Sequence, residues 1–215
     1  MELYKTIKQQ ATAEQIIEKS RFIAHARPVS DREEADAFVA EIKAKYKDAT
    51  HNVPAMVIGD KSQIQWASDD GEPQGTSGAP IVQMLVNEGL TKLVIVVTRY
   101  FGGIKLGTGG LVRAYTSSAK LAVEAAGVCG VQNMLRLTCE TDYTHLAKFQ
   151  KMAAGSLKDQ TAFEYVIDNV KYGEKVTLEL VTFAENEEEL KGLIANLTSG
   201  SARITASSVA PEKTP

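Results

Sequence analysis

Apolar and polar residues in the first fifty positions change from the spacing of strands to that of a helix. Residues 15–18 and 22–26 predict two strands. Ser30 and Glu33 then predict a capping box, in which two side chains bond free N–H groups at the start of a helix. The apolar residues that follow share one face of this helix: Ala35, Phe38, Val39, Ile42 and Tyr46.

A hairpin and a second helix are expected next. The segments 55–58 and 64–66 predict antiparallel strands joined by a turn. Thr76 and Ser77 precede a helical stretch and can cap it, and Gly89 is expected to end it.

The most apolar segment is 93–97, Leu-Val-Ile-Val-Val. No polar residue alternates with its apolar ones, so it predicts a strand that is covered on both faces. A glycine-rich loop, 102–110, leads from it into a helix that ends at Gly127. This helix is expected to bury Leu111, Tyr115, Ala119, Ala122 and Ala126.

The remainder of the chain predicts the order β-α-β-β-α-β, which is that of ferredoxin-like domains. Strands are expected at 135–139, 162–167, 176–183 and 203–209. One helix is expected to end at Gly155, and Asn186 is expected to cap the other. We predict an α+β protein with an N-terminal domain at 1–128, a ferredoxin-like domain at 129–209 and a disordered tail at 210–215.

Composition and charge limit the classes of function. The 215 residues are 44% hydrophobic and 24% charged, which is ordinary for globular proteins. Two cysteines, Cys129 and Cys139, are too few for a disulfide framework. Because no signal peptide or membrane-spanning run is present in the sequence, we expect a cytoplasmic protein that does not contact membranes.

The net charge of -3 also bears on partners. Residues 1–128 carry 15 Lys/Arg and 15 Asp/Glu, so the remaining residues carry 24 − 15 = 9 and 27 − 15 = 12. A protein that coats nucleic acid is normally basic. Contact with RNA must therefore come from a local patch, and sequence-specific reading of DNA is not expected.

Two segments carry the residues that suggest chemistry, 68–80 and 99–113. In both, glycines lead into a helix, whose first N–H groups and partial positive charge favour an anion. The predicted anion- or nucleic-acid-binding residues are Thr76, Ser77, Gly78, Arg99, Gly102, Gly103, Lys105, Gly107, Thr108, Gly109, Gly110 and Arg113. The alternative is that these glycines only make tight turns and close packing. Neither segment has the spacing of a Walker A loop or a dinucleotide-binding motif.

Acidic residues before the second helix offer a further hypothesis. Asp69, Asp70 and Glu72 could hold a divalent cation with His51, or serve as acid and base. Equally, they could be turn formers or pair with nearby arginines. No catalytic residue, metal or cofactor is assigned from these residues. Tyr100 could stack on a base, because it lies where a strand leaves for a loop.

Residues 93–107, and above all Arg99-Tyr-Phe-Gly-Gly-Ile-Lys-Leu-Gly107, resemble the defining motif of the YigZ/Impact family. Residues 69–80 are similar to its second motif. Lys19-Ser-Arg-Phe22, which includes Arg21, and His51-Asn52 match positions usually seen in the family. The resemblance covers about 16–127, and the second part resembles the C-terminal domain of bacterial members.

This resemblance implies that the first domain is folded like the second domain of ribosomal protein S5. It implies that the second domain is ferredoxin-like, similar to domain five of elongation factor G. Eukaryotic members with an additional N-terminal domain regulate translation initiation by binding protein partners. The resemblance supplies no catalytic residues.

Three functional hypotheses remain open at this point. The first is a non-enzymatic cytoplasmic factor that regulates translation, contacting RNA, the ribosome or a partner protein through the glycine-rich loops. The second is an enzyme that acts on a small phosphorylated substrate. The third is a protein–protein regulatory module that does not bind nucleic acid.

Overall fold

The computed structural model describes residues 2–153 and 163–213. The chain divides into two compact units that each mix helices with a sheet, one formed mainly by Glu2–Val131 and one by Gln132–Glu212. The division falls within the strand β7 (Val128–Thr141). None of the helices in the described ranges has the length and apolar character needed to traverse a bilayer.

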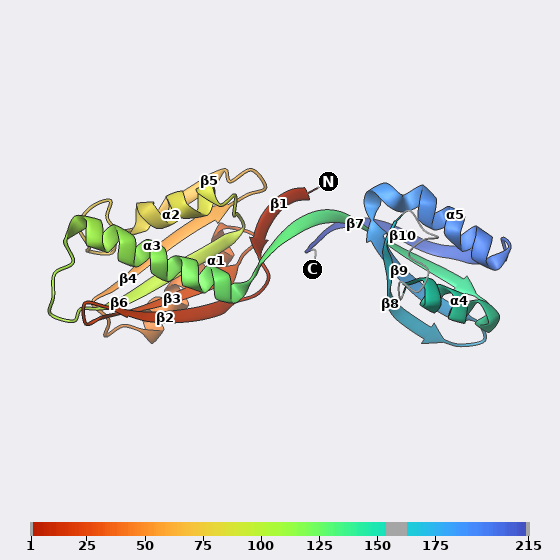
Figure 1. The fold of residues 1–215 in the computed structure, drawn as a ribbon, viewed down its shortest axis with the longest axis horizontal. Helices are drawn as coiled ribbons and strands as arrows, with labels where there is room; N and C mark the ends of the chain where they lie inside the picture. Colours follow the sequence, from red (N-terminus) through yellow and green to blue (C-terminus); the bar gives the residue numbers. More distant parts are fainter. Residues whose placement is uncertain (1, 154–162, 214–215) are drawn as a thin grey trace. The chain divides into compact units, whose positions relative to one another are not determined.

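The first unit is built on an antiparallel five-stranded sheet (Figure 1). In spatial order its strands are β2 (Ala11–Ile17), β3 (Ser20–Pro28), β6 (Leu93–Tyr100), β4 (His51–Ile58) and β5 (Ile64–Ala67). The predicted hairpin is confirmed, because residues 55–58 of β4 pair antiparallel with residues 64–67 of β5. The predicted strand 22–26 is part of β3, and the predicted strand 15–18 overlaps β2, which ends at Ile17.

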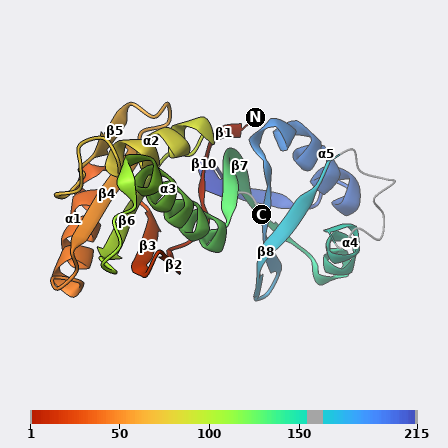
Figure 2. The same ribbon diagram turned by 60° about the vertical axis from the view of Figure 1, so that its left-hand side comes forward.

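Helices cover both faces of this sheet (Figure 2). On one face lie α2 (Gly78–Asn87) and α3 (Gly107–Ala126), which contribute Ile81, Leu85 and Tyr115 to the larger core. On the other lies α1 (Arg32–Lys45), which contributes Ala35, Phe38 and Ile42 to a smaller one.

The central strand β6 confirms the prediction of burial on both faces. Leu93, Ile95 and Val97 belong to the core beneath α2 and α3, whereas Val94 and Val96 belong to the core beneath α1. Since side chains alternate along a strand, the next position on the first of these faces is 99. Arg99 of β6 therefore lies on the face of the sheet that α3 covers, at the end of the core.

The ends of α1 and α3 follow the sequence with one correction. The cap of α1 is Asp31, which accepts from the N–H of Glu34, while the Glu34 carboxylate accepts from the N–H of Ser30. The predicted capping box, with Ser30 and Glu33, was therefore one residue too early. Gly127 ends α3 with a φ of 70°, as predicted.

The N-terminal strand β1 (Glu2–Ile7) was not predicted. Its apolar residues are few, and its partners lie far along the chain, because it pairs with β7 and Lys5 also forms an isolated parallel bridge with Leu90. Periodicity within a short segment does not reveal such a distant pairing.

The second unit has the predicted order of elements. After β7 come α4 (Tyr143–Ala153), β8 (Tyr165–Tyr172), β9 (Val176–Phe183), a single 3₁₀ turn, α5 (Glu187–Thr198) and β10 (Arg203–Lys213). Antiparallel pairs join β7 to β9 and β9 to β8, and β10 pairs with β7. The predicted end at Gly155 and the residues 154–162 lie outside the described residues.

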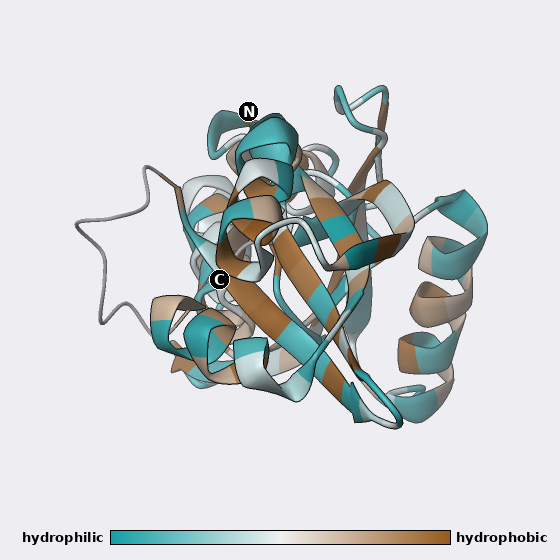
Figure 3. Cartoon of the chain, turned by 90° about the vertical axis from the view of Figure 1, so that its right-hand side faces the viewer, coloured by the Kyte–Doolittle hydropathy of each residue, from teal (hydrophilic) through white to brown (hydrophobic). Residues whose placement is uncertain are grey.

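One apolar layer holds this unit together. Phe149 of α4 and Leu190 of α5 pack against alternate residues of β7 and β9. Figure 3 shows hydrophobic residues along the strands in its hydropathy colouring. Cys139 lies in this core, and burial raises the pKa of its thiol to about 11. Asn186 occupies the cap position of α5, but its side-chain oxygen accepts from no N–H group of the helix, and its amide N–H donates to the hydroxyl of Thr182.

The prediction of a disordered tail at 210–215 was wrong for its described part, because β10 continues to Lys213. Glu212 accepts from Arg136, and the ammonium group of Lys213 donates to the carbonyls of Ile7 and Lys8. These side-chain partners hold a segment whose composition alone suggested disorder. Residues 214–215 lie outside the described residues.

Candidate functional site

Arg99 leaves the end of β6 beneath the start of α3, and its charge is already neutralised. Its Nη1 donates to Oε1 of Glu72 at 2.6 Å, and its Nη2 donates to Oγ of Ser20 at 3.3 Å. The residue is only 5% exposed. The expectation that Arg99 offers a free positive charge to phosphates therefore has to be corrected. Its Nε, however, is buried and has no acceptor among the described residues.

Glu72 is the centre of a buried polar cluster. Besides Arg99, it accepts a hydrogen bond of 2.7 Å from the hydroxyl of Tyr115, and Nε2 of His51 lies 3.7 Å from the same Oε1. Burial and the bond to Glu72 raise the pKa of Tyr115, so the phenol stays protonated and donates. These contacts bind the carboxylate within the protein.

The start of α2 is occupied by the chain's own carboxylate. Asp69 accepts from the N–H groups of Gly75, Ser77 and Gly78 at 2.7 to 3.1 Å, and also from the hydroxyl of Ser77 at 2.7 Å. Partial burial raises the pKa of Asp69, but these bonds outweigh it and lower the pKa below its ordinary value.

This arrangement corrects the predicted role of Thr76, Ser77 and Gly78. Two of them bond Asp69, and the hydroxyl of Thr76 donates to the carbonyl of Pro73. An internal anion already satisfies the groups that were expected to hold an external one.

Asp70 and His51 are likewise engaged. The carboxylate of Asp70 accepts from the ammonium of Lys43 and from the N–H of Asn52, and its carbonyl lies 2.8 Å from Nδ1 of His51. Over residues 2–153 and 163–213, no three His, Cys, Asp or Glu side chains are grouped so that they could hold a metal ion. The acidic residues of 69–72 thus act as internal hydrogen-bond acceptors, which was the alternative interpretation of this segment.

The start of α3 is different, because nothing in the described chain caps it. Leu106 occupies the cap position and cannot bond the helix through its side chain. The N–H groups of Gly107, Thr108 and Gly109 belong to the first turn, and none of them has a partner among the described residues. Lys105 and Arg113 flank this turn.

Both of these cations have charges that remain available. No ion pair of Lys105 or Arg113 occurs in the described ranges. The helix start and the two side chains together present positive potential to solvent.

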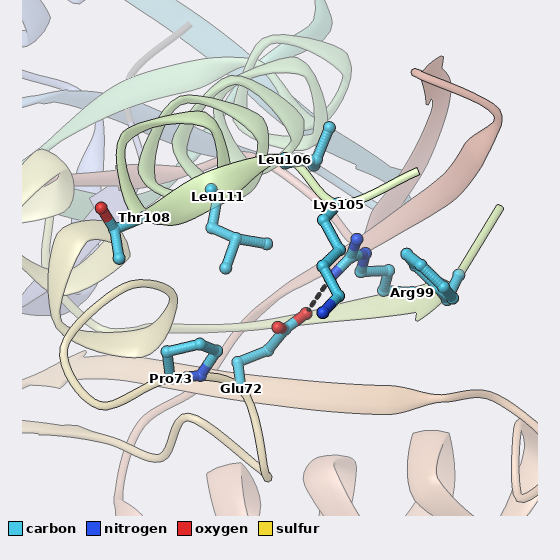
Figure 4. Close-up of a pocket in the computed structure, with 9 residues that line it drawn as sticks. Glu72, Pro73, Arg99, Lys105, Leu106, Thr108 and Leu111 are labelled. Carbon is cyan, nitrogen blue, oxygen red and sulfur yellow. Dashed lines mark hydrogen bonds and ion pairs between the residues drawn. The ribbon is translucent and has the colours of Figure 1, made fainter. Parts of the chain in front are cut away.

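Two hollows share Lys105 and Leu106 in their lining. The first has a volume of about 350 Å³ and is lined by Glu72, Pro73, Arg99, Phe101, Lys105, Leu106, Gly107, Thr108 and Leu111 (Figure 4). The second has a volume of about 470 Å³ and is lined by Ile17, Glu18, Ile104, Lys105, Leu106, Gly110, Arg113, Ala114 and Ser117. Lys105 borders both, whereas Arg113 borders only the second.

Five of the six predicted glycines divide into two groups, and at the sixth, Gly110, an added Cβ would lie 3.0 Å from Cβ of Leu106. A side chain at Gly102 would meet the backbone carbonyl of Lys19 at 2.0 Å, and one at Gly78 would meet that of Ser68 at 2.8 Å. Close packing therefore explains these two residues, as the alternative interpretation held. Gly103, Gly107 and Gly109 have no such close neighbour, so packing does not explain them.

The secondary candidates Arg21 and Tyr100 line neither hollow. Arg21 forms a two-pronged pair with Glu14 at 2.8 Å, and the hydroxyl of Tyr100 donates to Asp48. The neighbouring Phe101, 46% exposed, is the aromatic residue that borders the first hollow.

Sequence reasoning missed Ser20 and the polar role of Tyr115. Ser20 accepts from Arg99 and from the N–H of Gly102, so it ties the loop to β3. Tyr115 was recognised as a core residue of a helix, which hid the function of its hydroxyl. The matched segment 19–22 was the available signal for Ser20.

Comparison with known proteins matches both units. Residues 18–123 match the model of the Impact N-terminal domain, and residues 139–201 match a domain of unknown function, DUF1949. The chain is 38% identical over 201 residues to IMPACT family member YvyE of Bacillus subtilis, covering 94% of this chain and 89% of that protein. It is 33% identical to IMPACT family member YigZ of Escherichia coli, over 88% of this chain and 91% of that protein. A solved structure described as a hypothetical protein is 32% identical and superposes with a TM-score of 0.58. The match covers 96% of this chain and 98% of that one.

Proposed function

The chain belongs to the IMPACT family, and from this premise we propose that it is a binding protein that contacts RNA phosphates through the surface around the start of α3. We propose further that it acts in the cytoplasm on translation, by contact with RNA or the ribosome. The contact surface consists of the open first turn of α3, Lys105 and Arg113.

The observation that carries this proposal is the first turn of α3, which lies between two cations and, like them, has no partner within residues 2–153 and 163–213. Its three free N–H groups point out of the helix start, where the partial positive charge of the helix adds to that of Lys105 and Arg113. Local sequence reinforces the effect, since residues 89–123 contain no Asp or Glu. A surface of this kind attracts phosphate although the whole chain is acidic.

The arrangement of the second unit supports a link to translation. The pairs β10–β7, β7–β9 and β9–β8 are those expected of a ferredoxin-like sheet and support this fold, and β1 also pairs with β7. We infer this fold for residues 129–209 and a fold like domain two of ribosomal protein S5 for residues 1–128. A similar pair of domains occurs in elongation factor G. Likeness of fold does not by itself give function, so the α3 surface remains the main support.

Catalysis is less well supported than binding. The residues that an enzyme would use as acid or base are Asp69, Asp70, Glu72 and His51, and the structure engages each of them in internal bonds. A general base needs a free acceptor within reach of its substrate. This engagement favours a binding role for the same loops.

Titration of a single-stranded RNA at several salt concentrations tests the proposal. With about two phosphates neutralised, the plot of log K against log[salt] should have a slope of about -1.5. Lys105→Ala and Arg113→Ala should each reduce that slope by about 0.7. Lys120→Ala serves as the matched control, because Lys120 lies on the same helix but pairs with Glu88.

Two results would reject the proposal. One is the lack of any RNA binding at low salt. The other is equal binding by the Lys105, Arg113 and Lys120 variants, which would place the contact elsewhere.

A further inference from the structure

The first hollow combines features that a chain of phosphodiesters does not need. The open N–H groups of Gly107 and Thr108 lie at one wall, and Lys105 reaches into the same space (Figure 4). At another wall lies Arg99, which is 95% buried and whose Nε has no acceptor among the described residues. A buried, unsatisfied N–H donor is costly, and a ligand oxygen would relieve that cost.

The donors in this hollow suit a group with several terminal oxygens. A phosphomonoester presents three oxygens and a charge of about -1.5 to -2 at neutral pH. A phosphodiester within a chain has only two free oxygens, one negative charge, and a nucleotide attached on each side. Because the buried arginine lies at the wall of a hollow of about 350 Å³, a chain end reaches it more readily than a chain interior.

An aromatic ring borders the same hollow. Phe101 is 46% exposed, and the guanidinium carbon of Arg99 lies 5.4 Å from its ring centroid. A base or ribose attached to the bound phosphate can pack on the open part of this ring. The hollow therefore has a place for the terminal phosphate and one for the nucleoside next to it.

We propose that the first hollow binds the terminal phosphomonoester of a nucleotide, either at the end of an RNA chain or in a free mononucleotide. This proposal rests on the proposed function, since it assigns the α3 surface a specific ligand. Arg99 through Nε, Lys105 and the amides of Gly107 and Thr108 hold the phosphate. Glu72 balances the charge of Arg99, so that the guanidinium is kept in place before the ligand arrives.

One RNA decamer made with four kinds of end tests the proposal by fluorescence anisotropy. The ends are a 5′-phosphate, a 3′-phosphate, both phosphates, or hydroxyl groups only. At pH 7.5 at least one phosphorylated form should bind about tenfold more tightly than the hydroxyl form. At pH 5.5 this ratio should fall to about threefold or less, since the second pKa of a phosphomonoester is about 6. Uridine 5′-monophosphate, titrated by calorimetry, provides the free-nucleotide arm.

Two variants locate the effect. Lys105→Ala should abolish the preference for phosphorylated ends, because Lys105 borders the first hollow. Arg113→Ala is the matched control, since Arg113 borders only the second hollow and should weaken all RNA forms to the same extent. Arg99→Lys keeps the positive charge but removes Nε, and it should also reduce the preference. Circular dichroism shows whether each variant is folded.

The outcomes separate this inference from the broader function. Equal affinity for all four RNA forms overturns the terminal-phosphate site, while salt-dependent RNA binding would leave the proposed function intact. Binding of uridine 5′-monophosphate that depends on Lys105, without RNA binding, supports the site and rejects the RNA role. Binding of neither RNA nor the mononucleotide overturns both.

Discussion

The starts of α2 and α3 share a glycine-rich sequence, the same face of the same sheet and the same partial positive charge, yet only one is open. At α2, Asp69 bonds three N–H groups and the hydroxyl of Ser77. At α3, the first N–H groups have no partner among the described residues. One helix start is a structural element, and the other is a candidate binding site.

The difference arises from the acidic residues before each helix. Asp69 lies nine residues before Gly78, and the turn at Asp70 and Gly71, with φ values of 50° and 90°, bends the chain so that Asp69 faces the helix start. No acidic residue precedes α3 between Gly89 and Gly107. A glycine-rich helix start is therefore a candidate anion site only where the preceding loop lacks a carboxylate that can reach it.

The largest expected effect is that of removing the internal anion. Asp69→Asn should destabilise the protein by about 3 kcal/mol, because the amide replaces a charged acceptor and places an NH₂ group against backbone N–H groups. Urea unfolding followed by circular dichroism measures the loss. Asp31→Asn, which affects the cap of α1, should change stability by less than about 0.5 kcal/mol because asparagine also caps well.

The same interaction predicts a dependence on pH. The folded pKa of Asp69 is lowered, so its contribution is present above the unfolded value near 3.8 and is lost as the pH falls through the folded value. The asparagine variant should therefore lose less stability than the parent protein as the pH falls below about 4. If both proteins lost the same stability as the pH falls, Asp69 would not act as the internal anion.

Replacing one glycine at each helix start with alanine should show whether that glycine is needed for close packing or for its backbone conformation. Gly78→Ala forces Cβ to 2.8 Å from the carbonyl of Ser68 and should cost about 2–3 kcal/mol. Gly107→Ala meets no neighbour but requires a φ of 69°, which should cost about 1 kcal/mol. Thermal unfolding compares the two.

Asparagine distinguishes the two causes, because it tolerates positive φ better than alanine. Gly107→Asn should therefore be more stable than Gly107→Ala. Gly78→Asn should not be more stable than Gly78→Ala. A recovery of stability at position 78 would contradict the packing explanation.

The sequence predicted most of the fold because its signals are local. An unbroken apolar run predicted the buried strand β6, and Gly127 correctly marked the end of α3. The strand β1 was not predicted, because its partners, β7 and Leu90, lie far along the chain. Similarly, β10 extends beyond its predicted end because its last residues bond Arg136 and the backbone of the N-terminal strand.

Less of the candidate site could be predicted from the sequence. Lys105 and the first turn of α3 are where the glycine pattern indicated, but Arg99 is bound to Glu72 and the α2 start is filled by Asp69. Such pairings depend on which carboxylate reaches which donor, and loop conformation decides that. Charge counted along the chain cannot distinguish a neutralised arginine from a free one.

A carboxylate placed at the α3 start should make it resemble that of α2. Thr108→Asp should stabilise the protein by about 0.5–1 kcal/mol, because a negative charge in the first turn interacts favourably with the helix dipole. The same change should weaken RNA binding about tenfold, since the carboxylate competes with phosphate. Thr108→Asn, which has the same shape without the charge, should change RNA affinity by about twofold at most. Undiminished RNA binding by Thr108→Asp would show that the helix start does not contact the ligand.

The smallest expected effect is that of Gly109→Ala. This variant tests whether the start of α3 needs glycine itself or only its free N–H groups to bind the ligand. Gly109 has no positive φ, and an added Cβ would meet only a guanidinium nitrogen of Arg113 at 3.8 Å. Gly109→Ala should therefore stabilise α3 by about 0.5 kcal/mol through its higher helix propensity. RNA affinity should stay within about twofold, because the N–H group at 109 remains open. If this variant gained stability but lost RNA binding, the ligand would have to approach the backbone more closely than a methyl group allows, and glycine itself would be part of the site.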